Sequence, residues 1–283
     1  MILGGHVFPK TDDPEEYVAL HKKAGFQAGC FPFKRGEIMD HDRVMAYKKA
    51  FEKENIIIAE VGAWGNNPVS KDPVEAEESV KNTAAKLAIA DEVNALCCVN
   101  IIGFYDSENP IHPNNFSGDF YAYALDQYRK IIDLVKPKRA KMCFEVYPFN
   151  FLNGADAYAR FIEDIDRPAA GVHLDPINCV STISDYFNSG KVMAEAVRKL
   201  RPYGIVSLHM KDLFLRPHRP NTELLETRLG TGGLDFKPLY REIINTLPAD
   251  TPVIIEHLDT EEDYRLAAEA ARKIMKEVLE DAV

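Results

Sequence analysis

Short apolar runs alternate with amphipathic stretches along the whole chain. Each run is rich in β-branched and small apolar residues, and each is followed by a longer segment whose apolar positions recur at helical spacing. Strands are therefore expected at 2–8, 25–31, 56–61, 95–102, 140–147, 170–175, 204–209 and 252–257. Helices are expected at 13–23, 43–53, 73–93, 120–135, 155–163, 192–200, 236–246 and 261–280.

Strands that alternate with helices in this way predict a parallel sheet of the α/β class, because parallel neighbours need a crossover connection. The count of eight strands, without a Gly-x-Gly-x-x-Gly segment after the first, favours a closed (β/α)8 TIM barrel over an open doubly wound sheet. No linker, low-complexity stretch or shift in composition divides the chain. We therefore expect a single TIM-barrel domain over residues 1–283, with long loops after strand four (103–118) and strand seven (210–235).

Four acidic or imidazole side chains stand at the ends of the fifth to eighth expected strands: Glu145, Asp175, His209 and Glu256. Any one of them alone could simply end a strand at the wet rim. Because successive strands of a closed parallel barrel end around one mouth, all four should converge there. Three carboxylates and one imidazole suit one divalent cation, with Mn²⁺ favoured and Mg²⁺, Co²⁺ and Zn²⁺ as alternatives.

Several motifs around this quartet are typical of a known family. They are Phe144-Glu145, His173-Leu-Asp175, Leu208-His209-Met-Lys-Asp212, Ile254-Ile-Glu256 and Leu229-Gly-Thr-Gly-Gly-Leu-Asp-Phe236. They resemble the xylose isomerase-like barrel superfamily, and more narrowly its sugar isomerase/epimerase branch, which includes ketose 3-epimerases and inosose-processing enzymes. The resemblance implies that the quartet binds one divalent metal, and that Glu145 and Glu256 also exchange a proton with the substrate.

The chemistry expected from such a site is proton abstraction next to a carbonyl. A metal that chelates the carbonyl oxygen and the neighbouring hydroxyl stabilises the enediolate, and a carboxylate beside it takes the proton. With Glu145 and Glu256 on opposite sides of the metal, one could remove the proton and the other return it to the opposite face. We therefore expect a divalent-metal-dependent isomerase or epimerase of a keto sugar or cyclitol.

Two positions depart from the pattern of ketose 3-epimerases. Those enzymes carry a His that contacts the ketose where this chain has Asn178, and an Arg where it has Leu215. The departures favour an alternative, a metal-dependent lyase on a 3-keto sugar, similar to an inosose dehydratase or to the barrel subunit of a C-glycoside deglycosidase. A DNA-repair endonuclease of the endonuclease IV pattern would need several further His and acidic ligands for a three-metal site. The chain has only eight His, and few of them stand at strand ends. A sugar-binding barrel without catalysis is the alternative from a different class.

Other residues near the expected mouth are candidate substrate contacts, each weighed against an ordinary role in the core, at the rim or on a solvated loop. Trp64, the only Trp, offers a stacking surface. Arg228, with the basic stretch 216–220, could hold a substrate phosphate. By strand alternation His257 should point away from Glu256. The candidates are His6, Glu60, Trp64, Asn100, Tyr147, Asn178, Lys211 and Arg228.

Composition and charge limit the classes of partner and the location that we expect for this protein. A net charge of −10 and a pI of about 5.4 argue against nucleic acid, whose phosphates need a basic surface. No apolar run is long enough to span a membrane, and the first residues lack the pattern of a secretory signal. The five cysteines lack metal-site spacing and are expected to be buried thiols of a reduced protein. We expect a cytoplasmic enzyme acting on a small sugar or glycoside, a homo-oligomer by resemblance, with a small partner subunit if the lyase alternative holds.

Overall fold

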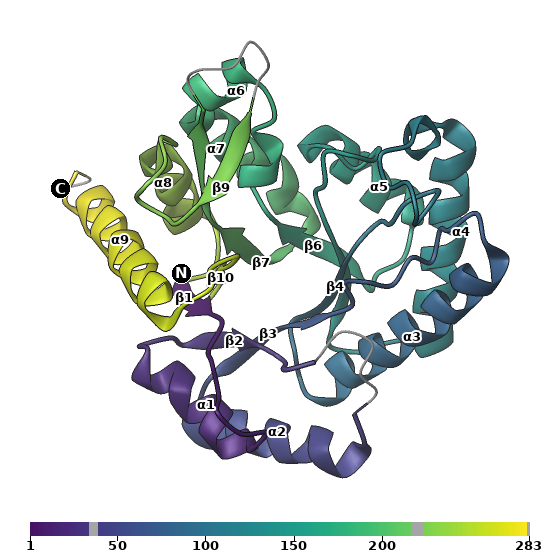
Figure 1. Ribbon diagram of the computed structural model, residues 1–283, viewed down its shortest axis with the longest axis horizontal. Helices are drawn as coiled ribbons and strands as arrows, with labels where there is room; N and C mark the ends of the chain where they lie inside the picture. Colours follow the sequence, from purple (N-terminus) through teal and green to yellow (C-terminus); the bar gives the residue numbers. More distant parts are fainter. Residues whose placement is uncertain (34–38, 217–222, 282–283) are drawn as a thin grey trace.

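The computed structural model describes residues 1–33, 39–216 and 223–281. Eight parallel strands close into a barrel in the order β1-β10-β7-β6-β5-β4-β3-β2, and helices surround it (Figure 1). The expected TIM barrel is confirmed. The barrel strands are β1 (Ile2–Gly5), β2 (Ala28–Cys30), β3 (Ile57–Gly62), β4 (Cys97–Ile101), β5 (Lys141–Glu145), β6 (Ala170–Leu174), β7 (Ile205–Met210) and β10 (Pro252–Ile255).

Several helices begin at a capping residue. Asp13, Asp40 and Asp72 each accept a hydrogen bond from a backbone N–H of the first turn. Among the described residues, no helix has the length and apolar character to cross a membrane. The α-helices are α1 (Pro14–Lys23), α2 (His41–Glu54), α3 (Pro73–Glu92), α4 (Gly118–Val135), α5 (Ala155–Ile165), α6 (Ile183–Phe187), α7 (Ser189–Leu200), α8 (Phe236–Thr246) and α9 (Glu261–Glu280). Short 3-10 helices are η1 (Pro113–Phe116), η2 (Ile177–Cys179) and η3 (Arg201–Tyr203).

The two long loops carry structure that the periodicity did not predict. After β7 the chain forms an antiparallel ribbon of β8 (Asp212–Leu215) and β9 (Leu224–Thr227), outside the barrel. The loop after β4 contains η1, and α6 precedes α7. These elements are four or five residues long, too short to leave a clear period in the sequence. The ribbon matters most, because it stands over the end of β7 where His209 lies.

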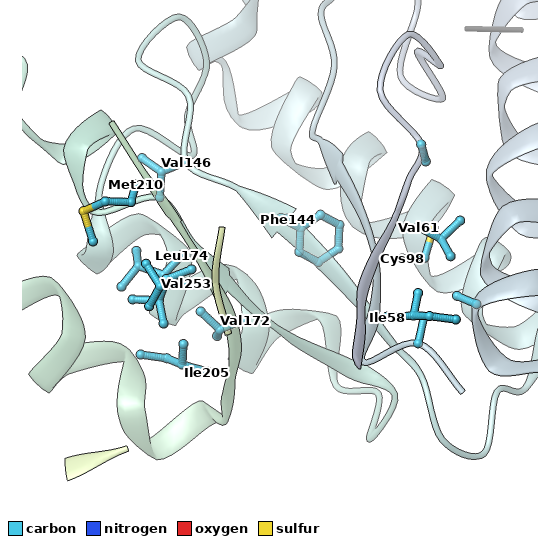
Figure 2. Close-up of a cluster of buried hydrophobic side chains, with 14 of the residues drawn as sticks. Ile58, Val61, Cys98, Phe144, Val146, Val172, Leu174, Ile205, Met210 and Val253 are labelled. Carbon is cyan, nitrogen blue, oxygen red and sulfur yellow. The ribbon is translucent and has the colours of Figure 1, made fainter. Parts of the chain in front are cut away.

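Alternate side chains of the barrel strands form two different layers. Those facing the helices are large and apolar, and Figure 2 shows part of this layer, including Phe144, Leu174 and Val253. Those facing the barrel axis are mostly small, as in the cluster of Ala28, Cys30 and Ala59 around Ile254 and the cluster of Cys97, Val99 and Cys143. All five cysteines are free thiols, and only Cys179 is partly exposed. The small interior leaves room for polar side chains at the carboxyl ends of the strands.

His21 on α1 is a buried titratable group that gives a test of the fold by pH. Its Nδ1 lies 3.0 Å from the Tyr17 carbonyl oxygen, and its Nε2 packs so closely on Gly29 that any side chain there would clash. Burial lowers the pKa of His21 from 6.5 to about 4. The unfolded chain therefore binds this proton at a higher pH than the folded protein, so the stability contributed by neutral His21 is lost as pH falls from about 6.5 to 4.

The expected result is a difference in pH slope between the wild type and His21→Gln. Between pH 7 and pH 4.5, the free energy of unfolding of the wild type should fall by about 2–3 kcal/mol more than that of the variant. Urea unfolding at both pH values measures this. Equal slopes would show that the pKa of His21 is the same in the folded and unfolded states.

Candidate metal centre

Glu145, Asp175, His209 and Glu256 meet at the carboxyl ends of β5, β6, β7 and β10. All four are buried, and each offers one ligand atom within 4.8 Å of the others. The His209 Nδ1 lies 2.7 Å from Glu256 Oε2 and 3.8 Å from Glu145 Oε1. The convergence expected from the four strand ends is present in the structure.

Neighbouring groups orient two of these carboxylates. Glu145 Oε2 accepts a hydrogen bond from Trp64 Nε1 at 3.0 Å, and Oε1 accepts one from Asn178 Nδ2 at 3.1 Å. Asp175 Oδ1 accepts from the backbone N–H of Ile177 at 2.8 Å and of Asn178 at 3.1 Å. Both carboxylates are thus held in place without a ligand, and Asn178, expected as a substrate contact, lies against Glu145.

Lys211 lies inside the centre. Its Nζ is 2.7 Å from Asp175 Oδ2, 2.7 Å from Glu256 Oε1 and 3.0 Å from Glu226 Oε1, and its side chain is 2% exposed. Burial alone would lower the pKa of Lys211, but Asp175, Glu256 and Glu226 raise it above its ordinary value. Lys211 was expected to contact substrate or an Asp; in the structure its ammonium group is a counter-ion to Asp175, Glu256 and Glu226.

The electrostatics of the quartet favour a cation. Burial raises the pKa of Asp175, with Lys211 opposing. Burial would also raise the pKa of Glu256, but His209 and Lys211 hold it well below its ordinary value. Burial would lower the pKa of His209, but Glu256 and Glu60 raise it well above its ordinary value. Three carboxylates and one imidazole at this spacing fit a divalent cation of the Mg²⁺ or Mn²⁺ type.

Glu60 on β3 lies beneath His209, deeper in the barrel. Its Oε2 is 3.2 Å from His209 Nε2, and its Oε1 is 3.9 Å from His173 Nδ1. Burial would raise the pKa of Glu60, but the rings of His209 and His173 lower it. A buried Glu was expected to need a partner, and His209 is that partner. Glu60 therefore contacts a candidate metal ligand and does not face the open pocket.

Trp64 joins the quartet to a cavity of about 460 Å³. Its ring stacks on His209 with the centroids 5.9 Å apart, and it lines the cavity together with His6, Phe31, Phe33 and Phe104. His6 is exposed at the rim beyond β1. Trp64 and His6 are therefore placed where a substrate could reach them.

Tyr147 also lies near the mouth. It is partly buried, and its ring meets Phe104 and Phe149 edge to face. Burial, together with the charge of Glu145, raises the pKa of Tyr147. It is therefore protonated at neutral pH and offers a hydroxyl donor near the quartet.

Two further candidate substrate contacts, Asn100 and Arg228, have partners within the protein. Asn100 is fully buried on the helix-facing side of β4, where its amide donates to the Asn66 carbonyl at 3.1 Å and to the Tyr128 hydroxyl at 3.4 Å. The expectation that it contacts substrate is wrong, because strand alternation turns it away from the barrel axis. The Arg228 guanidinium is 3.4 Å from Asp263 on α9. Residues 217–220 of the basic stretch lie outside the described residues.

The ribbon brings Glu226 to the rim, a residue that the sequence did not indicate, and His257 lies beside it. Glu226 on β9 contacts Lys211, and its Oε2 lies 2.6 Å from His257 Nδ1. His257 was expected to point away from Glu256, but its Nε2 is 3.5 Å from Glu256 Oε2, because β10 has ended and His257 has a left-handed φ of 57°. The segment Leu224-Leu-Glu-Thr227 does not alternate between apolar and polar residues, so its pattern could not have predicted β9.

Asp212 anchors the segment that follows the ribbon. Its carboxylate accepts hydrogen bonds from the backbone N–H groups of Leu213, Gly230, Gly232 and Leu234, at 2.8–3.3 Å. A side chain on Gly232 would clash with Asp212. The Gly-rich motif therefore owes its glycines, at least in part, to this close approach.

Solved structures share this architecture at low sequence identity. L-ribulose 3-epimerase is 17% identical, with a TM-score of 0.74 over 99% of this chain and 96% of that chain. Endonuclease IV from Thermus thermophilus is 14% identical, with a TM-score of 0.75 over 98% and 100%. A xylose isomerase-like TIM barrel protein from Mycobacterium smegmatis, in complex with magnesium, is 16% identical, with a TM-score of 0.67 over 93% and 87%. At such identities these likenesses show the fold alone.

A comparison with curated proteins gave no match. A family model does match, over residues 18–277, which is nearly the whole barrel. Its description is the xylose isomerase-like TIM barrel, the superfamily that the motifs around the quartet resemble. This chain therefore belongs to the xylose isomerase-like TIM barrel family.

Proposed function

We propose that this protein is a divalent-cation-dependent isomerase or epimerase of a keto sugar or cyclitol. The observation that carries the proposal is a pair of buried carboxylates, Glu145 and Glu256. Both lie within 3.8 Å of the same nitrogen, His209 Nδ1, and beside Asp175. The magnesium-bound relative supports a divalent cation, and Mn²⁺ is our proposed ion. The net charge of −10 makes DNA a poor substrate for this barrel.

The residues divide the work between holding a cation and moving a proton. Glu145, Asp175, His209 and Glu256 would hold the cation, which when bound supplies a Lewis acid for a carbonyl oxygen. Glu256 is ionised at neutral pH and can accept a proton from the carbon next to that carbonyl, while Lys211 Nζ, 2.7 Å away, stabilises its charge. Glu145, oriented by Trp64 and Asn178, can return a proton.

One observation favours a second candidate, elimination from a 3-keto glycoside. The cavity beside Trp64 is lined by Phe31, Phe33 and Phe104, a wall better matched to an apolar substituent than to a polyhydroxylated chain. Proton abstraction by Glu256 or Glu145 would then expel a group β to the carbonyl, with the bonding pair leaving on that group. The same site would thus give a lyase if the substrate carries such a group.

Proton exchange tests both candidates. The Mn²⁺-loaded protein is incubated in D₂O with free ketoses, inososes and 3-keto glycosides, and each mixture is followed by NMR. Deuterium at the carbon α to the carbonyl is expected for at least one substrate. An epimeric or isomeric product supports the first candidate, and release of the aglycone supports the second. Absence of exchange with every substrate, while Mn²⁺ is bound, would contradict both.

A further inference from the structure

A chain of buried polar groups runs from the metal centre down the barrel axis, and the proposed function does not use it. Glu60 contacts His209, His173 Nδ1 lies 2.7 Å from Ser207 Oγ, and Ser207 Oγ lies 3.7 Å from Cys97 Sγ. Glu60, His173 and Ser207 are fully buried. Buried groups of this kind are costly in a barrel interior unless each finds a partner.

We infer that Glu60 is a positioning residue that keeps the proton of the His209 ring on Nε2 and leaves the Nδ1 lone pair for the cation. The inference rests on the proposed metal centre. An imidazole can bind a metal through Nδ1 only if Nδ1 carries no proton, and a carboxylate that accepts from the other nitrogen selects that tautomer. Glu60 Oε2, 3.2 Å from Nε2, is placed to accept this bond.

The ring of His209 is held on more than one side. It stacks on Trp64 at an interplanar angle of 30°, and the His173 ring meets it edge to face with centroids 4.1 Å apart. Its Nδ1 faces Glu256 and its Nε2 faces Glu60. The imidazole is therefore fixed in orientation, and a cation on Nδ1 would leave Nε2 to donate its proton to Glu60.

A local irregularity of the sheet turns Glu60 inward. The pairing of β2 with β3 shifts register between Gly29 and Cys30, and Cys30 then pairs with Glu60. Ala59 belongs to an interior cluster, yet its neighbour Glu60 also reaches the barrel axis. Regular alternation would point one of them at the helices. Irregularities of this kind re-aim side chains next to active sites.

The same residues allow one competing role. Glu60, His173 and His209 also offer ligand atoms within 4.8 Å of one another, so Glu60 could hold a second cation. Glu60 Oε1 and His173 Nε2 have no hydrogen-bond partner among the described residues. A second cation on His209 Nε2 would need that nitrogen unprotonated, the opposite of the tautomer inferred above, so the two roles can be separated.

Calorimetric titration with Mn²⁺ is the first test, on the wild type, Glu60→Gln and His21→Gln. The wild type should bind one equivalent. Glu60→Gln should bind the same equivalent about 10–100-fold more weakly, because the neutral amide can donate to Nε2 as well as accept from it. His21→Gln, a buried polar substitution on α1, controls for loss of stability and should leave the Mn²⁺ affinity unchanged.

A spectroscopic signature separates positioning from a general structural role. With ¹⁵N-His protein and diamagnetic Mg²⁺, long-range ¹⁵N–¹H spectra should show His209 protonated on Nε2 and not on Nδ1, and Glu60→Gln should lose this pattern. His209→Gln assigns the signals. Unchanged affinity and tautomer in Glu60→Gln would overturn the inference and leave the proposed function intact. Two equivalents in the wild type, one of them lost in Glu60→Gln, would make Glu60 a ligand instead. No Mn²⁺ bound by the wild type would overturn the metal centre itself.

Discussion

Glu256→Gln should slow deuterium exchange by about 10³-fold at saturating Mn²⁺, because a positioned general base contributes roughly 10²–10⁴-fold. The substitution keeps the shape of the side chain and removes its ability to take a proton. Glu256 is 4% exposed, so bulk water cannot easily replace it. The exchange rate is measured by NMR with whichever ketose, inosose or keto glycoside the wild type labels.

The same substitution also removes a ligand, so the metal content of each sample must be measured. Glu145→Gln is the matched variant. If the two carboxylates serve opposite faces of the substrate, each variant should lose exchange with one epimer more than with the other. Exchange within tenfold of the wild type in Glu256→Gln, at full Mn²⁺ occupancy, would rule out Glu256 as the base.

The quartet could be predicted from the sequence because one physical rule was sufficient. Parallel strands of a closed barrel end at the same mouth, so residues such as Glu145 and Asp175, 30 positions apart in the chain, must meet there. The periodicity of apolar runs fixed the strand ends closely enough for this.

The partners of the quartet depended on details that periodicity does not contain. Asn100 was placed in the pocket, although one step of strand alternation turns it toward α4. Glu60 reaches the axis through a shift in register between β2 and β3. Glu226 arrives on a ribbon of two four-residue strands whose pairing is set by tertiary contacts. A left-handed residue, His257, reverses the direction expected after β10. Each of these depends on a local backbone choice that a single sequence does not reveal.

Asp175→Asn should lose Mn²⁺ binding while the metal-free protein stays as stable as the wild type. In the metal-free state Asp175 is a fully buried carboxylate whose pKa is raised by burial, so its charge is costly there. Asn can still accept the backbone hydrogen bond from Ile177, and Lys211 keeps Glu256 and Glu226. We expect the free energy of unfolding without metal to change by less than about 1 kcal/mol, against the destabilisation usual for core substitutions.

Added Mn²⁺ should then separate the two proteins. A cation that binds only the folded state, at 100 times its Kd, stabilises the wild type by about 2.7 kcal/mol. That corresponds to a rise in Tm of roughly 4–5 °C for a chain of this size. Asp175→Asn should show no rise at the same Mn²⁺ concentration, and a chelator should abolish deuterium exchange in the wild type until Mn²⁺ is restored. This result would show that Asp175 contributes to metal binding and not to the stability of the metal-free fold. If instead Asp175→Asn unfolds more easily without metal and keeps the Mn²⁺-dependent rise in Tm, Asp175 holds the fold and is not a ligand.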